Sequence, residues 1–96
     1  MKESAYQKGL VKRIKDRFPN SVVMKTDASQ IQGCPDLLIL QKDKWAMLEV
    51  KQSEKATRRP NQEYYVNKFN DMSFSSFIFP ENEEEVLNAM ERSFES

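Results

Sequence analysis

The segment GCPDLLILQKDKWAMLEVK, residues 33–51, contains two apolar runs separated by a single polar break at residues 41–44. Apolar runs of this length, joined by so short a break, predict a β-hairpin. A two-residue loop at Lys42 and Asp43 pairs Gln41 with Lys44, so that the numbers of paired residues add to 85. A four-residue loop over the whole break gives the same register. The hairpin therefore has one expected register whichever loop forms.

This register places two acidic residues opposite each other. Asp36 faces Glu49, with Cβ atoms about 4.5–5.5 Å apart, as in any cross-strand pair. Because carboxylates are rare in half-buried strands and repel each other, the pair needs a reason, and oxygen ligands suit Mg²⁺ or Mn²⁺. Side-chain alternation adds Lys51 to the face of Glu49. We expect Asp36, Glu49 and Lys51 to converge on a divalent metal site.

Length and composition restrict the remaining possibilities. The 96 residues make a single domain, residues 1–96, and the sequence contains neither a bilayer-spanning apolar run nor a signal-peptide segment, so a cytoplasmic location is expected. One cysteine, Cys34, excludes an internal disulfide and is expected to pack as a small hydrophobic residue. The absence of histidine excludes histidine-based catalysis and argues against a zinc site.

Charge is unevenly distributed along a chain whose formal net charge is zero. Residues 1–59 contain thirteen Lys or Arg against seven Asp or Glu, a balance of +6, and residues 60–96 contain two against eight, a balance of −6. The basic half favours a nucleic-acid partner. A solvated surface with an acidic last helix explains the same asymmetry, and both interpretations stay open here.

Hydrophobic spacing predicts three helices around the hairpin. Apolar residues recur every four positions in a first helix that ends at Pro19, and Glu3 lies on the same face, two turns before Leu10. A second helix is expected to be capped by Thr57, with Pro60 in its first turn. A third begins with a capping-box pattern at Asn82 and Glu85. The apolar stripes consist of Tyr6, Leu10, Ile14 and Phe18; then Tyr65, Val66 and Phe69, with Gln62 as the polar member; then Val86, Met90 and Phe94.

Four strands complete the prediction, at residues 21–26, 35–40, 45–51 and 74–79. The resulting α/β fold is a mixed sheet with helices on both faces, in the order α-β-β-β-α-β-α. The helix between the last two strands makes them parallel, whereas the first three form an antiparallel meander. Apolar residues on both faces of the second strand indicate burial on both sides. Trp45 and Met47 share the face of Glu49 and are expected to pack in the core under the first helix, with a dimer surface as the alternative.

Pro35 and Asp36, followed by Glu49, Val50 and Lys51, resemble the PD-(D/E)xK nuclease motif. The wider pattern of residues 33–38, with Asn61 and Gln62, resembles the VRR-NUC branch of that superfamily, over Glu3 to about Phe79. The resemblance implies a restriction-endonuclease-like fold. The family is similar to Holliday-junction resolvases and other structure-selective nucleases, and its compact bacterial and phage members are homodimers.

Site roles follow from the resemblance residue by residue. Asp36 and Glu49 would be metal ligands, with the Val50 backbone carbonyl as a further ligand. Lys51 would polarise the attacking water or stabilise charge on the phosphate. Glu3 resembles the family's acidic residue on the first helix, which binds or orients a metal. Gln62 resembles the glutamine that approaches the catalytic lysine or the scissile phosphate; capping the helix is its other possible role.

The loop after the hairpin carries Lys55, Arg58 and Arg59, which are expected to bind DNA phosphates; solubility is the alternative explanation. The sequence thus predicts a Mg²⁺- or Mn²⁺-dependent endonuclease acting as a homodimer on branched DNA such as Holliday junctions. Two alternatives stay open. One is a sequence-specific or nicking nuclease of restriction or homing type, and the other is a non-catalytic DNA-binding protein with the same fold.

Overall fold

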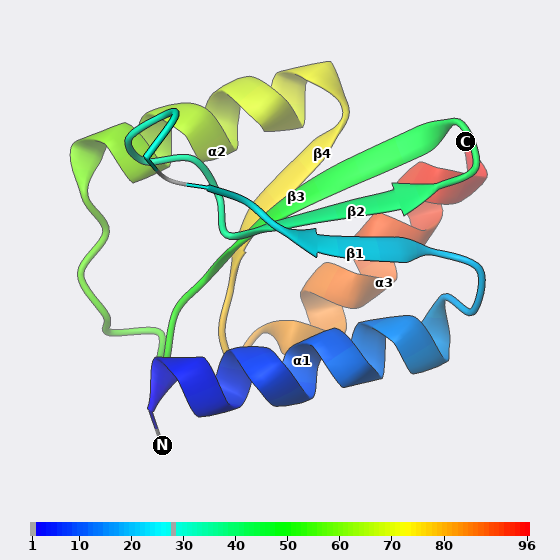
Figure 1. The fold of residues 1–96 in the computed structure, drawn as a ribbon, viewed down its shortest axis with the longest axis horizontal. Coiled ribbons are helices and arrows are strands. Elements are labelled where there is room, and N and C mark those ends of the chain that lie inside the picture. The colour runs from blue at the N-terminus through cyan, green and yellow to red at the C-terminus, as the bar shows by residue number, and fades with distance from the viewer. Residues whose placement is uncertain (1, 28) are drawn as a thin grey trace.

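The computed structural model describes residues 2–27 and 29–96. A four-stranded sheet lies between a layer formed by α1 and α3 and a second layer formed by α2 (Figure 1). Within this part of the chain, no helix is long and apolar enough to cross a membrane. The elements follow the predicted order: α1 (Glu3–Arg17), β1 (Val22–Lys25), β2 (Leu37–Gln41), β3 (Lys44–Val50), α2 (Pro60–Met72), β4 (Phe74–Ile78) and α3 (Glu83–Glu95).

The hairpin has the predicted register. In the sheet order β1-β2-β3-β4, the first three strands are antiparallel and β4 is parallel to β3. Gln41 pairs with Lys44 and Leu37 pairs with Leu48, so the two-residue loop is the one that forms. Lys42 turns this loop with a φ of 56°, in the left-handed region. Asp36 and Lys51 lie just outside the strands, one residue before β2 and one after β3.

The main core lies between the sheet and the α1/α3 layer. Leu10 and Ile14 of α1, Leu48 of β3 and Met90 of α3 are fully buried there. A smaller cluster of Val66, Phe77 and Phe79 lies under α2. The strand alternation that sends Leu48 into the main core sends its neighbours to the α2 side.

Trp45 therefore packs against α2, and the prediction that it lies under the first helix is wrong. Its ring contacts Phe69 edge-on, with centroids 6.1 Å apart. Met47, on the same strand face, is buried. Alternation assigned the two residues to one face correctly, but it does not tell which helix covers that face.

Burial of both faces of β2 is also a wrong prediction. Leu37 and Ile39 are fully buried on the α1 side, whereas Leu40, on the other face, is 37% exposed. Its neighbours on β1 are more open, with Val22 51% and Met24 48% exposed. The reason is that α2 lies over β3 and β4 and leaves the β1 and β2 part of this face uncovered (Figure 1).

Both predicted helix caps are replaced by other contacts. At the start of α2 the cap residue is Arg59, not Thr57, and the Gln62 side chain accepts a hydrogen bond from the Arg59 backbone N–H at 3.0 Å. Asn82 does precede α3, but its side chain makes no cap bond to that helix. Instead its carboxamide binds the edge strand β4, accepting from the Phe79 N–H at 2.8 Å and donating to the Phe77 carbonyl at 3.2 Å.

Asn70 of α2 makes a similar contact further along β4. Its side-chain oxygen accepts a hydrogen bond from the Ser75 N–H at 3.1 Å. The Lys51 N–H donates a hydrogen bond to the Ile78 carbonyl, so the backbone groups of residue 78 point toward the β3 side. Because successive residues of a strand point their backbone groups to opposite edges, those of residues 75, 77 and 79 point away from β3. Two asparagine side chains thus occupy part of the free edge of the sheet.

Ion pairs between α1 and α3 absorb part of the charge asymmetry. Arg13 binds Glu83 through two hydrogen bonds of 2.7 and 2.9 Å, and Arg17 lies 2.9 Å from Glu91. The Arg13 guanidinium holds the pKa of Glu83 below its usual value. The acidic last helix is therefore partly neutralised by the basic first helix.

Candidate active site

Asp36 is held by the two strands beside it. Its backbone carbonyl accepts a hydrogen bond from the Thr26 N–H at 2.9 Å, and its Oδ2 accepts one from the Val50 N–H at 2.8 Å. The carboxylate thus takes the place of a ladder bond where the pairing of β2 and β3 ends. Thr26 also donates its hydroxyl to the Pro35 carbonyl. Sequence reasoning missed this positioning role of Thr26, although its place opposite Asp36 at the end of β1 was a usable signal.

Glu49 lies beside Asp36 on the α2 side of the sheet and is 4% exposed. Burial, followed by the negative charge of Asp36, raises the pKa of Glu49 to about 8. Burial also raises the pKa of Asp36, against the lowering effect of the Val50 N–H. The two carboxyl groups are therefore neighbours, as the predicted register required, and their negative charges repel each other.

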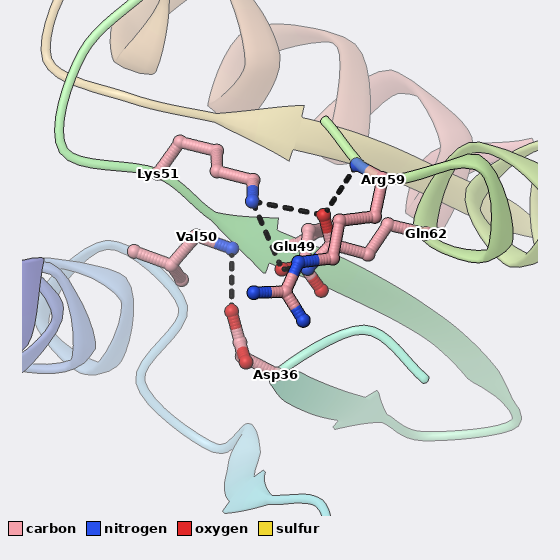
Figure 2. Close-up of polar contacts among 6 residues, drawn as sticks. All are labelled: Asp36, Glu49, Val50, Lys51, Arg59 and Gln62. Atoms are coloured by element: carbon pink, nitrogen blue, oxygen red, sulfur yellow. Dashed lines mark hydrogen bonds and ion pairs between the residues drawn. The ribbon is translucent and has the colours of Figure 1, made fainter. Parts of the chain in front are cut away.

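The Gln62 carboxamide links the lysine to this pair (Figure 2). Its Oε1 accepts a hydrogen bond from Lys51 Nζ at 2.9 Å, and its Nε2 donates to Glu49 Oε2 at 3.1 Å. The Lys51 ammonium group lies 4.0 Å from the same Glu49 oxygen and is almost fully buried. Gln62 thus caps α2 and also bonds Lys51 and Glu49, and its part in catalysis stays a prediction.

A cleft of about 190 Å³ opens over these side chains. Asp36, Glu49, Gln62 and Arg59 line it, together with Gln32, Gly33, Cys34 and Asn61. Figure 2 shows the Arg59 side chain extending toward the two carboxyl groups. Gln32 and Asn61 were given no role from the sequence; their signal was adjacency to Gly33 and Gln62. Cys34 is half-buried in the wall, and burial raises the pKa of its thiol.

The three predicted DNA-binding residues lie in different surroundings. Lys55 is exposed in the loop between β3 and α2. The Arg58 guanidinium lies 4.3 Å from the centroid of the Phe77 ring, at a polar groove beside β4, whereas Arg59 lies at the carboxylate cleft. The structure thus brings Arg59 together with the acidic pair and directs Arg58 to another surface.

Glu3 lies at the first turn of α1 and is exposed. Its charge acts on Glu49 through space and raises the pKa of that residue slightly further. Within residues 2–27 and 29–96, however, no group of three or more Asp, Glu, His or Cys side chains is arranged to hold a metal. The structure therefore brings together Asp36 and Glu49, without a third carboxylate from α1.

The donor groups at the cleft suit a hard divalent cation. Asp36 Oδ2 accepts a hydrogen bond from the Val50 N–H, and Glu49 Oε2 accepts one from Gln62 Nε2, so each carboxyl group has a second oxygen atom on the same cleft. Because the Val50 N–H points to Asp36, strand geometry directs the Val50 carbonyl to the same side. Mg²⁺ is commonly bound by one or two carboxylates, with water and substrate phosphate as further ligands. Asp36, Glu49 and the Val50 carbonyl fit this pattern.

Larger clefts exist elsewhere, and in one of them the polar groups satisfy one another. The cleft of about 560 Å³ between α1 and α3 contains Tyr6, Arg13 and Glu83. The Tyr6 hydroxyl and the Arg13 guanidinium both donate hydrogen bonds to the Glu83 carboxylate. The smaller cleft over Asp36 and Glu49, whose negative charges repel each other, is the better candidate for a catalytic site.

Comparison with known proteins gives a result at the level of the fold. No family model matches the sequence, and no curated protein matches it. A solved structure described as a VRR_NUC domain matches with a TM-score of 0.59 and 22% identity, over 90% of this chain and 90% of that chain. This chain has a VRR-NUC-like fold.

A second solved structure, Archaeoglobus fulgidus Hjc, a Holliday junction resolvase from an archaeal hyperthermophile, matches with a TM-score of 0.47 and 11% identity. That match covers 72% of this chain and 64% of the resolvase chain. The VRR-NUC-like fold confirms the predicted mixed sheet and element order. The fold alone does not identify the chemistry, which depends on Asp36, Glu49, Lys51 and Gln62.

Proposed function

We propose that this VRR-NUC-like chain is a Mg²⁺- or Mn²⁺-dependent endonuclease that hydrolyses DNA phosphodiester bonds. The observation that supports this proposal is that Asp36, Glu49 and Gln62 line one cleft and that the Gln62 carboxamide joins Glu49 to the buried Lys51. Two carboxylates that repel each other beside a buried lysine lower the stability of a protein. Such a cluster is therefore expected where the protein uses it for function. A metal-assisted phosphodiesterase uses all of these groups.

The roles of the chain's own residues follow from their contacts. Asp36, Glu49 and the Val50 carbonyl would hold the cation, which when bound activates water and neutralises charge on the phosphate. Lys51 is held by the Gln62 carboxamide with its ammonium group beside Glu49, where it can donate a hydrogen bond to the attacking water or the phosphate. Arg59, at the mouth of the cleft, would bind a phosphate oxygen of the strand. Glu3 remains a candidate for orienting the metal.

The proposed substrate is branched DNA such as a Holliday junction. Phosphate contacts by Arg59 and Lys55 bind the backbone without reading its sequence. Selectivity for a branched shape then requires two clefts at a fixed separation, which a homodimer provides, since a two-fold axis matches the approximate two-fold symmetry of a four-way junction.

The test is cleavage of four-way junction, flap, nicked and linear DNA with Mg²⁺ or Mn²⁺. We expect the junction to be cut fastest, and we expect Asp36→Ala and Lys51→Ala each to lower the rate by about 10²-fold or more. Asp43→Ala, in the turn at the far end of the hairpin, is the matched control and should cut at the parental rate.

Three results would contradict the proposal. They are no cleavage of any substrate with either metal, equal cleavage by the parent and the Asp36 variant, and undiminished cleavage in excess chelator. Stable binding of junction DNA without cleavage would favour a non-catalytic DNA-binding protein. Discrete cuts in unbranched DNA would favour a sequence-specific nuclease.

A further inference from the structure

A polar groove of about 350 Å³ lies between α2 and the edge strand β4, outside the carboxylate cleft. Its lining includes one positive and one negative side chain, Arg58 and Glu63. Most of the other lining residues carry neutral amides or hydroxyls, and these are Asn67, Asn70, Asn82, Ser75 and Ser76. The groove therefore offers hydrogen bonds without a net charge. We call it the β4 groove.

Arg58 forms one wall of the β4 groove. Its guanidinium carbon lies 4.3 Å from the centroid of the Phe77 ring and 5.8 Å from that of the Phe79 ring, and both rings are buried. The Arg58 residue itself is exposed, and no carboxylate of residues 2–27 and 29–96 lies within ion-pair distance of it. One side of the planar guanidinium thus contacts an aromatic ring, and the other side is open to a ligand.

Ser75 adds a buried polar group that lacks a partner. The residue is 5% exposed, and its hydroxyl oxygen has no hydrogen-bond partner in the part of the chain that the structure describes. It lines the β4 groove from the α2 side of β4, where strand alternation also places Phe77. Because a buried hydroxyl without a hydrogen bond is unfavourable, a ligand that bonds Ser75 gains affinity.

The hydrogen bonds already made in the β4 groove disfavour a peptide as its ligand. A peptide that joins a sheet as a further strand needs the free backbone groups of the edge strand. The side chains of Asn70 and Asn82 already bond the backbone of residues 75, 77 and 79. What remains for a ligand is the open side of Arg58, the Ser75 hydroxyl and the outward amide of Asn67.

We propose that the β4 groove binds an unpaired base of the DNA substrate, stacked on the Arg58 guanidinium. Arginine planes and aromatic rings stack on unpaired bases largely without regard to sequence. Neutral amides and hydroxyls, such as those of Asn67 and Ser75, bond the edge of a base. A phosphate is a poorer ligand here, because the Glu63 carboxylate offsets the positive charge of Arg58. Arg58 therefore binds a base, in place of the phosphate expected from the sequence.

The β4 groove and the carboxylate cleft lie on neighbouring strands. Phe77, which Arg58 covers, pairs with Glu49 across the parallel strands β3 and β4. Neighbouring strands are about 4.8 Å apart. Arg58 and Arg59 are adjacent in the chain, just before α2, and line the groove and the cleft respectively. A DNA strand that crosses the start of α2 therefore places a phosphate at Arg59 and a neighbouring base in the β4 groove.

This inference rests on the proposed function and narrows its substrate. A base can enter the β4 groove only after it leaves the helical stack, which costs least where base pairing is already interrupted. The preferred substrate is therefore a branch point with an unpaired nucleotide beside the scissile phosphate. Part of the selectivity for branched DNA then comes from a groove within one chain.

Binding of junction DNA in excess chelator, without cleavage, tests the β4 groove. The probes are two four-way junctions with one unpaired nucleotide at the branch point, which carries a base in one junction and is abasic in the other. We expect the parent to bind the abasic junction about 10-fold more weakly. Arg58→Lys keeps the charge but loses the plane, so it should bind both junctions as weakly as the parent binds the abasic one. Arg92→Lys, exposed on α3 in the opposite layer, is the matched control and should bind as the parent does.

Ser75→Ala separates a binding role from a structural one. Because the Ser75 hydroxyl has no partner within the described residues, its removal should leave the urea unfolding of the protein unchanged or shifted to higher urea concentration. The same variant should bind the junction with the unpaired base about 3-fold more weakly than the parent does, and the abasic junction equally well. An unchanged preference for the base would contradict the role of Ser75.

Three results would overturn the base-binding groove. They are no binding of either junction, equal binding of the two junctions by the parent, and an undiminished preference for the base in Arg58→Lys. Failure of the nuclease proposal gives a different result. Base-dependent binding without cleavage in Mg²⁺ or Mn²⁺ would contradict the nuclease alone, whereas cleavage without any dependence on the unpaired base would contradict the groove alone.

Discussion

Gln62 shows how much a single side chain can coordinate at this site. Its carboxamide contacts Lys51, Glu49 and the backbone of Arg59, so the helix start and the charged pair share one residue. The two acceptor contacts fix which end of the amide faces the lysine. From the sequence, Gln62 was recognisable as the polar member of an apolar stripe, but its simultaneous contacts depend on where α2 crosses β3, which no local pattern specifies.

Glu49 gives the metal-free protein a specific dependence on pH. Its folded pKa of about 8 exceeds the ordinary value of 4.5, so between these pH values the folded protein retains a proton that the unfolded chain has lost. The free energy of unfolding should therefore fall as pH rises across this range. We therefore compare the free energy of unfolding of Glu49→Gln with that of the parent at two pH values. The difference should favour the variant more at pH 8.5 than at pH 5, by about 1.4 kcal/mol or more, the value of one pKa unit.

Urea unfolding of parent and variant at the two pH values measures this difference. Mg²⁺ should raise the stability of the parent at pH 8.5, release protons on binding, and lose both effects in the Glu49→Gln variant. An equal change in stability at pH 5 and pH 8.5 would show that the Glu49 carboxyl is not perturbed.

At the scale of elements, the segment between β1 and β2 is fitted against the start of α2. Gly33 has a φ of +91°, and a Cβ atom there would lie 2.8 Å from the backbone carbonyl carbon of Asn61. We expect Gly33→Ala to cost about 1–3 kcal/mol through backbone strain, and to lower cleavage further by displacing Gln62 and Arg59. Thermal unfolding and junction cleavage are the measurements.

Gly9→Ala is the matched control for that substitution. Its added Cβ would meet the flexible end of the Arg13 side chain at 2.9 Å, within a helix where alanine is favoured over glycine by about 1 kcal/mol. This variant should be at least as stable as the parent. Equal behaviour of the two alanine variants would show that the contact between Gly33 and Asn61 does not position α2.

The elements themselves were predictable from sequence because each has a strong local signal. Alternation and one polar break fixed the hairpin register, and with it the neighbourhood of Asp36, Glu49 and Lys51. The helix caps were not predictable in the same way. Asn82 has the residue type of a cap but bonds β4, because the free strand edge competes for the same amide.

For the whole molecule, the sequence predicted the layers and their order but not the extent of their cover. Apolar residues at Leu38 and Leu40 indicated a buried face, and that inference assumes that a helix of the same chain lies over it. The exposure of Leu40 and Met24 shows that α2 is too narrow to cover four strands. Such a surface is visible only once the elements are placed together in space.

The asparagine side chains on β4 have a consequence for how the protein behaves at high concentration. An edge strand with free backbone groups can recruit further chains into a growing sheet, which leads to fibrils. Asn82 and Asn70 occupy the Ser75, Phe77 and Phe79 backbone groups that such growth would use. We expect the double variant Asn70→Ala and Asn82→Ala to form thioflavin-positive aggregates faster than the parent, and Asn67→Ala, on the same helix as Asn70, to behave as the parent. Unchanged aggregation of the double variant would show that these amides do not protect the edge. Faster aggregation would mean that two neutral side chains keep the sheet from growing into a polymer.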